Sequence, residues 1–175
     1  DFISNNENIK NIGLNYYNFE FIEIETFNQF TFNLLCQFKY EYMVKFLLKN
    51  GEININSKNA EITKSSFDGG YFDDKGNDSY REEKPALYIA VENRNIFLTK
   101  LLLENENIDV NLKYLYLHEK HFTYLSSSCK FERITDKIER TPLFLAVENQ
   151  DVEIVKLLLK HPKIDTNIKL IIENK

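Results

Sequence analysis

A segment near residue 152 carries apolar residues at helical spacing. They occur at i, i+3, i+6 and i+7, and charged residues occupy the opposite side of the same helical wheel. The apolar residues are Val152, Val155, Leu158 and Leu159, and the charged residues are Glu153, Lys156 and Lys160. The pattern predicts an amphipathic helix capped by Asp151, whose carboxylate can accept a hydrogen bond from an N–H group at the helix start.

A second, shorter helix is predicted just before this one. Thr141 is suited to cap its first turn, and Pro142 is suited to the first helical position, where a missing N–H donor costs nothing. The small Ala146 stands where two helices must approach closely. Because neither helix is long enough to be stable alone in water, we expect the two to pair and the pairs to stack.

The same pattern occurs three times along the chain. Residues 89–113 and 145–169 share Ala-Val-Glu-Asn, Lys-Leu-Leu-Leu and Ile-Asp-x-Asn in register, 56 positions apart. In the earlier copy Asn95 is the expected cap, and Ile96, Leu102 and Leu103 form the apolar stripe. A degenerate copy lies a further 55 positions earlier, at residues 44–50 and 53–56. A long internal period of this kind predicts a solenoid.

The repeated segments resemble the ankyrin repeat family. Residues 141–167 follow that family's helix–turn–helix pattern most closely, residues 85–111 slightly less so, and the first copy mainly in its second half. The resemblance implies an all-α repeat solenoid that binds other proteins, although the fold hosts many unrelated binding functions. It also implies that an Asn in the turn can be a hydroxylation substrate, and Leu103, Asp109 and Val110 around Asn111 fit that permissive pattern.

Two kinds of residue depart from the family pattern. Tyr88 and Phe144 replace a histidine that hydrogen-bonds within the repeat, and Lys39, Arg94 and Gln150 replace a glycine between the helices. If the glycine position keeps a left-handed backbone, each of these residues costs about 1 kcal/mol. We therefore expect modest stability for a repeat protein.

The spacing of the copies exceeds the usual ankyrin period of about 33 residues. The excess falls where the family has a β-hairpin finger, so we expect elongated fingers that lie side by side. The first insert is polar, whereas the second is apolar enough to need a partner. The expected organisation is one domain, 1–175, with a divergent N-terminal cap (1–30), a degenerate repeat (31–58), a finger insert (59–83), a repeat (84–113), a second finger insert (114–139), a repeat (140–169) and a tail (170–175).

Composition limits the function. The net charge of −5 comes from 27 acidic and 22 basic residues, without the basic clusters that nucleic acid or an anionic membrane requires. Cys36 and Cys129 form no disulfide framework, which favours the reducing cytoplasm or nucleus. The chain begins at Asp1 without an initiator Met, so we expect a fragment of a longer protein. No small-molecule substrate is indicated.

Candidate metal and catalytic motifs are weak. Asp73–Asp78 resembles a calcium loop, but Lys75 occupies a ligand position and Lys84 stands where the loop needs a Glu. A zinc site would use His118, His121 and Cys129, with the two histidines on adjacent helical turns, yet a fourth ligand is missing. The run 126–129 offers nucleophiles without a base to activate them. We expect no metal, no cofactor and no catalysis.

The expected function is therefore protein–protein interaction or scaffolding. In the family, partners dock on the concave face, formed by the finger tips and the ends of the inner helices. The candidate binding residues are Gln37, Phe38, Glu92, Asn93, Glu148 and Asn149, with Tyr114 and Tyr116 from the second finger. The repeated Glu-Asn forms an acidic ladder that favours a basic partner.

Two alternatives stay open. Glu148 and Asn149 can simply solvate a helix end, with the Asn helping the chain to turn there. The chain can also be a non-catalytic regulatory or substrate-positioning segment of a larger enzyme. Asn56, Asn111 and Asn167 are expected to be structural, with side-chain amides that tie the finger turns.

Overall fold

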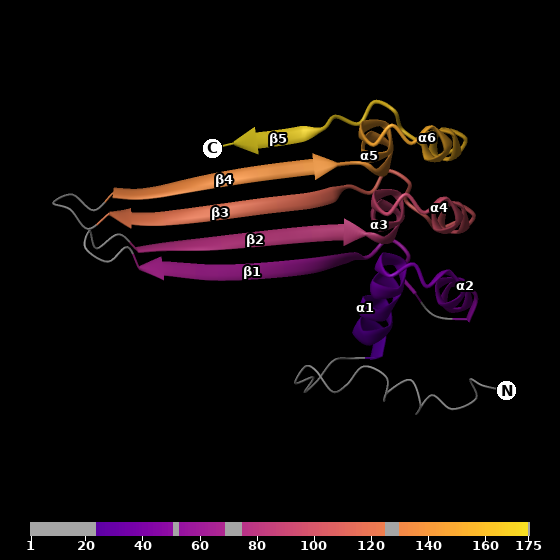
Figure 1. Cartoon of the computed structure of the whole chain (residues 1–175), viewed down its shortest axis with the longest axis horizontal. Helices are drawn as coiled ribbons and strands as arrows, with labels where there is room; N and C mark the ends of the chain where they lie inside the picture. The colour runs from indigo at the N-terminus through magenta and orange to yellow at the C-terminus, as the bar shows by residue number, and fades with distance from the viewer. Residues whose placement is uncertain (1–23, 51–52, 69–74, 125–129, 175) are drawn as a thin grey trace.

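Stacked helix pairs form one end of the molecule. The computed structural model describes residues 24–50, 53–68, 75–124 and 130–174. In these residues, an inner helix next to the strands pairs each time with an outer helix, and the pairs stack in chain order (Figure 1). They are α1 (Ile24–Gln37) with α2 (Glu41–Asn50), α3 (Ala86–Glu92) with α4 (Ile96–Leu103), and α5 (Pro142–Glu148) with α6 (Val152–Leu159). Of the expected N-terminal cap, residues 24–30 belong to α1 and residues 1–23 lie outside the described part.

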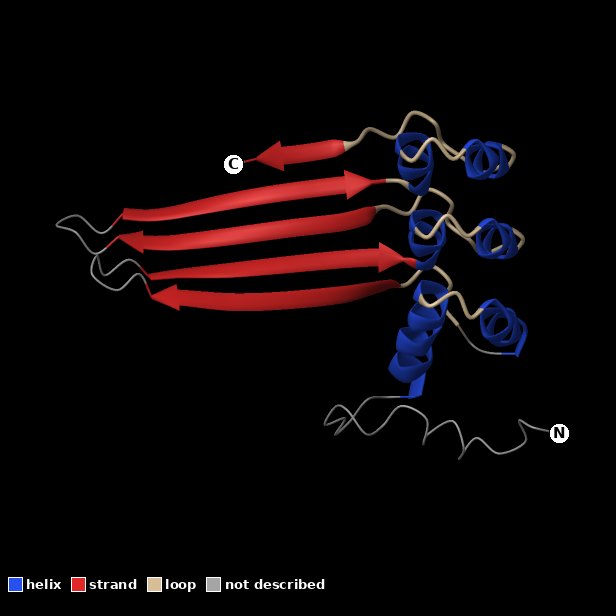
Figure 2. Ribbon diagram, viewed as in Figure 1, coloured by secondary structure: helices blue, strands red, loops and turns tan. Residues whose placement is uncertain are grey.

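The two inserts form β-hairpins that extend away from the helices. The first finger consists of β1 (Lys58–Asp68) and β2 (Lys75–Pro85), and the second of β3 (Tyr114–Tyr124) and β4 (Lys130–Arg140). Together with β5 (Ile171–Asn174) they make a five-stranded antiparallel sheet in chain order (Figure 2).

The all-α class expected from the sequence is therefore wrong. Helix stacking brings the bases of neighbouring fingers together, and the unpaired backbone groups along each finger's edge then find partners in the next finger.

The register of the sheet repeats along with the helices. Glu83 pairs with Leu115 where β2 meets β3, and Glu139 pairs with Ile171 where β4 meets β5. Both members of the second pair lie 56 positions after those of the first. The segment 170–175, expected to be a tail, thus contributes a strand that occupies the same place on β4 as β3 does on β2.

The predicted helix caps are confirmed. The side chain of Thr141 accepts a hydrogen bond from the N–H of Phe144 at 3.2 Å, and that of Asp151 accepts one from Ile154 at 3.2 Å. Asn95 caps α4 in the same way, at 2.9 Å from the N–H of Leu98.

The turn between the helices keeps its left-handed backbone in every copy. The φ angles are 61° at Lys39, 51° at Arg94 and 57° at Gln150. The condition under which these residues cost stability is thus met, at about 1 kcal/mol each.

The predicted apolar stripe of the outer helices is partly wrong. Leu158 is fully buried as expected, but so is Ile154, whereas Val152 and Leu159 are 63% and 49% exposed. In α4, Leu98, which was not part of the predicted stripe, is likewise fully buried. The reason is that α6 packs against both α5 and α4, so the buried surface is centred on the i, i+4 pair that faces between them.

Asparagine side chains join successive repeats. Asn111 Nδ2 donates to the carbonyl of Lys163 at 2.8 Å, and its Oδ1 accepts from the N–H of Asp165 at 2.9 Å. Asn56 makes the equivalent pair of bonds to Asn107 and Asp109, both at 2.7 Å. The side-chain amides therefore tie neighbouring turns together, whereas their own turns are held by Asn54 and Asp109, whose side chains accept from the N–H of Asn56 and Asn111. At the last repeat, the side chain of Asn167 makes no hydrogen bond to any described residue.

Replacing Asn111 by Ala should lower the free energy of unfolding by about 1–3 kcal/mol, because two inter-repeat hydrogen bonds are lost and their backbone partners are left unpaired. Asn167→Ala is the matched control, since it removes the same residue at the same repeat position without breaking such a bond. Its effect should stay within about 0.5 kcal/mol. Urea denaturation followed by circular dichroism measures both. Equal losses in the two variants would contradict the inter-repeat role.

Candidate functional site

At the finger bases, side chains on one face of the sheet contact the inner helices, and we call this face the inner face. Alternate residues of each strand point to it. Its membership is fixed by contacts at the helix ends: the ring of Tyr114 stacks on that of Tyr88 in α3 at 4.7 Å and 13°, and Arg140 lies 5.9 Å from the ring of Phe144 in α5. The inner face therefore runs continuously from the sheet onto α3 and α5.

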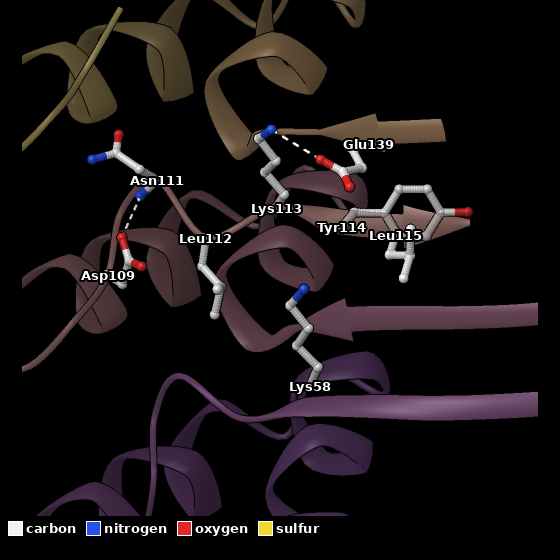
Figure 3. Close-up of a pocket in the computed structure, with 8 residues that line it drawn as sticks. All are labelled: Lys58, Asp109, Asn111, Leu112, Lys113, Tyr114, Leu115 and Glu139. Carbon is white, nitrogen blue, oxygen red and sulfur yellow. Dashed lines mark hydrogen bonds and ion pairs between the residues drawn. The ribbon is translucent and has the colours of Figure 1, made fainter. Parts of the chain in front are cut away.

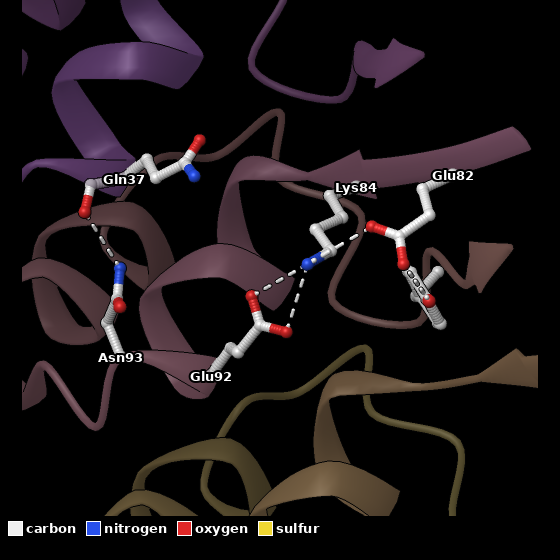
Figure 4. A network of polar contacts seen from close by, with 6 residues as sticks. Gln37, Glu82, Lys84, Glu92 and Asn93 are labelled. Carbon is white, nitrogen blue, oxygen red and sulfur yellow. Dashed lines mark hydrogen bonds and ion pairs between the residues drawn. The ribbon is translucent and has the colours of Figure 1, made fainter. Parts of the chain in front are cut away.

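Ion pairs join the base of each finger to the helix that follows it. Lys84 Nζ lies 3.1 and 3.2 Å from the carboxylate oxygens of Glu92, and 3.4 Å from Glu82 (Figure 4). Burial opposes the charge on Lys84, but its bonds to Glu92 and Glu82 outweigh that effect and raise its pKa. The equivalent pair in the last repeat, 56 positions after Lys84 and Glu92, joins Arg140 to Glu148 at 2.9 Å.

These ion pairs change the meaning of the predicted acidic ladder. Each glutamate of the ladder is already matched by a cation from its own finger. Side chains of Glu92 and Glu148 nevertheless remain 43% and 44% exposed, so each carboxylate can still meet a partner.

Tyrosines form the part of the inner face closest to the helices. The hydroxyl of Tyr114 donates to Glu82 Oε1 at 3.1 Å. Burial and the charge of Glu82 raise the pKa of Tyr114, and burial raises that of Tyr88 to about 12. Tyr116 lies one step further out, opposite Glu82 and Ile138 in the neighbouring strands. Both predicted tyrosines thus belong to the inner face.

A histidine lies further along the same face and connects the two fingers. The ring of His118 stacks on Tyr80 at 4.2 Å and 8°. Its two ring nitrogens lie 3.5 Å from Asp78 in the first finger and 3.6 Å from Asp136 in the second. The sequence analysis did not bring these four residues together. The alternation of residues between the two faces places them side by side, but it can be used only once the segments are known to be strands.

The zinc hypothesis loses its premise, because residues 118–121 form a strand where the spacing required a helix. Cys129, the Ser run 126–128 and the start of the calcium-like loop at 73–74 lie outside the described residues. Among the described residues, no group of three or more His, Cys, Asp or Glu side chains is placed to hold a metal ion.

The other predicted residues lie at the ends of the inner helices. Asn93 Nδ2 donates to the carbonyl of Gln37 at 3.1 Å, and Arg94 Nη2 donates to the carbonyl of Asn149 at 3.1 Å. These residues therefore tie the stack together. Phe38 has a side chain that is 63% exposed.

Two further residues, Phe144 and Val147, were missed by sequence reasoning. Val147 is 57% exposed, although its equivalent Val91 is only 1% exposed. Phe144 is 37% exposed, against 3% for Tyr88. The difference follows from position, because α5 packs on α3 and no described helix packs on the far side of α5. The last repeat consequently adds apolar surface beside the inner face.

The acidic excess lies on the inner face and on the helices beside it. Among strand residues with described side chains, the inner face has four carboxylates and three basic groups, a net charge of −1, and Glu92 and Glu148 on α3 and α5 add two further carboxylates. The carboxylates are Glu61, Asp78, Glu82, Glu92, Asp136 and Glu148, and the basic groups are Lys84, Lys120 and Arg140. On the opposite face the described strand residues balance, with Lys58, Lys64, Arg81 and Lys137 against Glu83, Glu119, Glu139 and Glu173.

A pocket of about 300 Å³ lies where the second finger leaves its repeat (Figure 3). Its polar groups are already bonded to protein: Lys113 binds Glu139 at 2.9 Å, and Asp109 accepts from the N–H of Asn111. Hydrogen bonds from Lys137 and Lys113 also hold the pKa of Glu139 below its usual range. The pocket therefore lies at a junction between repeats, where its polar groups hold the structure together.

Comparison with known proteins defines the class. Residues 17–170 match the family described as ankyrin repeats, in three copies. The chain belongs to the ankyrin repeat family, whose members are generally protein–protein interaction modules and are typically non-catalytic. It has no match among curated proteins or solved structures. In the part that the structure describes, no helix is long and apolar enough to cross a membrane.

The stacked tyrosines predict a loss of stability in alkali. The raised pKa values of Tyr88 and Tyr114 mean that the folded protein keeps protons that the unfolded chain releases above pH ~10. The free energy of unfolding should therefore fall as pH rises from about 10 to about 12. Denaturant titrations across this range should show a shallower fall for a Tyr88→Phe/Tyr114→Phe variant. Tyr42→Phe, at an 85% exposed position, should keep the original slope; an unchanged slope in the double variant would contradict the assignment.

Proposed function

We propose that this chain is a binding or scaffolding module that holds a basic protein partner against its inner face. The partner would contact the inner-helix ends at Gln37, Phe38, Glu92, Asn93, Glu148 and Asn149, and the second finger at Tyr114 and Tyr116. The observation that carries the proposal is the pair of half-exposed carboxylates, Glu92 and Glu148, which repeat along the inner helices beside a sheet face with a net charge of −1, whereas the strand residues of the opposite face balance. Complementary charge steers encounter and selects partners more than it adds raw affinity.

Exposed apolar groups support the same surface. Phe38 and Val147 are 63% and 57% exposed, and they lie at the ends of the inner helices with the ladder glutamates. Apolar anchors surrounded by charged groups are typical of protein interfaces. The long fingers extend the contact area beyond what the short inner helices offer. A buried free thiol at Cys36 suits the reducing cytoplasm or nucleus.

The test is capture of partners from a lysate of the source cells, read by mass spectrometry and repeated at several salt concentrations. The first variant, Glu92→Lys/Glu148→Lys, reverses the ladder. It should reduce capture of the specific partner about tenfold or more, since each lost charge contact at an interface costs on the order of 1 kcal/mol. Circular dichroism must first show that the variant is folded.

Two controls separate binding from structure. Glu106→Lys/Glu153→Lys makes the same change of net charge at exposed sites away from the inner face, and should leave capture unchanged. A charge-swapped variant, with Lys84→Glu and Arg140→Glu added to the ladder reversal, restores the internal ion pairs and net charge but moves the carboxylates onto the strands. Capture that stays low in the swapped variant supports direct contact with the ladder. Recovery of capture would show that the charge of the inner face and its ion pairs suffice, and that the carboxylates need not stand on α3 and α5.

A further inference from the structure

One long edge of the sheet lacks a strand that the fold elsewhere supplies. β1, β3 and β5 are equivalent first strands of their fingers, as Lys58, Lys113 and Lys169 at the same repeat position show. β3 pairs with the preceding β2, and β5 pairs with the preceding β4, in the same register. In the described part of the chain, β1 pairs only with β2 and forms the edge of the sheet.

The reason for the open edge is visible in α1. Strand β2 ends directly before α3, and a single residue separates β4 from α5. Both helices have seven residues. The residues at the equivalent place before the first repeat are instead helical, because α1 begins at Ile24 and has 14 residues. A strand of the β2 and β4 kind therefore does not form from residues 24–30, and no described residue pairs with the outer edge of β1 (Figure 1).

In the described part of the chain, the middle of this edge is exposed. β1 runs for 11 residues without a break in its pairing to β2, and each residue from Ala60 to Lys64 is exposed. Ile62, in the middle of this stretch, is 58% exposed. An unpaired strand of this length offers a row of N–H and C=O groups to which an extended segment can add.

We propose that an extended segment of a partner protein adds to this edge of β1, antiparallel to it, and carries a basic residue two positions before a glutamate. The pattern comes from the strands that fill the equivalent place in this molecule. Arg81 and Glu83 of β2 lie opposite Leu117 and Leu115, and Lys137 and Glu139 of β4 lie opposite Glu173 and Ile171. In both strands the basic and acidic residues also form an ion pair with each other.

The same register fixes which side chains meet on β1. The equivalents of Leu115, Tyr116 and Leu117 are Ala60, Glu61 and Ile62. The segment's glutamate then lies opposite Ala60 and its basic residue opposite Ile62. The residue between them meets Glu61, where an apolar side chain such as Ile138 of β4 is compatible and a carboxylate such as Glu82 of β2 is repelled. The edge therefore favours a segment like β4 over one like β2.

This surface is separate from the one in the proposed function. Strand addition uses the backbone edge of β1, whereas the basic partner contacts the inner face and the helix ends. A ladder reversal at Glu92 and Glu148 should leave binding at the edge unchanged. Either proposal can therefore fail without the other.

Two synthetic peptides with the chain's own sequences serve as probes for the test. One reproduces Lys130–Arg140 of β4 and the other Lys75–Pro85 of β2, each with a fluorescent label, titrated with the whole 175-residue chain and followed by fluorescence anisotropy. The β4 peptide should bind saturably, and the β2 peptide about threefold more weakly because its Glu82 faces Glu61.

Charge variants at Ile62 test the register. Ile62→Lys should weaken binding of the β4 peptide about threefold and Ile62→Glu should strengthen it by a similar factor, because the peptide's residue 137 is basic. A β4 peptide with Lys137→Glu should regain affinity for the Ile62→Lys chain, which closes a double-mutant cycle. Circular dichroism checks that each variant is folded.

Three results would overturn the proposal. The first is absence of saturable binding of the β4 peptide. The second is binding that does not respond to either Ile62 variant, which places the peptide elsewhere on the molecule. The third is a dimer of the unmodified chain, seen by sedimentation, that Ile62→Lys dissociates, because the edge would then be occupied by a second copy.

Discussion

The pairing of β2 with β3 is the interaction on which the arrangement of the molecule depends. It joins nine residue pairs, from Lys75 with Thr123 to Glu83 with Leu115, and it links strands that belong to different fingers. A two-stranded hairpin alone is at best marginally stable in water. Side-by-side pairing converts two such hairpins into the centre of a five-stranded sheet. The helix stack makes this pairing possible, because it holds the two finger bases next to each other with both fingers pointing in the same direction (Figure 2).

Contacts at the finger bases extend the order of the sheet to the proposed binding surface. The pairs Lys84–Glu92 and Arg140–Glu148 fix the sheet relative to α3 and α5, and the stack of Tyr88 on Tyr114 fills the angle between them. Exposed ion pairs are individually weak. Their repetition at each finger, together with the asparagine bridges between turns, gives the inner face a regular spacing of groups that one short helix could not hold.

Much of the fold could be predicted from the sequence, because its signals are local. Thr141 and Asp151 indicated where two helices begin. The two inserts, at equivalent points of the repeat, indicated fingers that lie side by side. The strand β5 could not be recognised, since four residues carry too little pattern. The pairing of Lys84 with Glu92 was equally hidden. It crosses from a strand to a helix, so its spacing of eight residues, repeated in Arg140 and Glu148, is not a contact distance of either element alone.

Burial was the least predictable property. Val91 and Val147 occur in the same Ala-Val-Glu-Asn sequence, yet one is 1% and the other 57% exposed. Local sequence decides which way a side chain points from its helix, but the place of the repeat in the stack decides whether another helix covers it. The apolar part of the candidate site was missed for this reason, whereas its glutamates were proposed from their positions in the repeat and Tyr114 and Tyr116 from the second insert.

Amide hydrogen exchange of the intact chain, resolved by residue with NMR, tests the continuous sheet most directly. A strand with neighbours on both sides has every amide hydrogen-bonded, whereas an edge strand has only alternate amides bonded. The structure predicts slow exchange at consecutive amides of residues 79–83 and 115–119, where β2 and β3 meet, and alternate slow exchange along β1. Alternate protection in β2 and β3 as well would show two separate hairpins and would contradict the account.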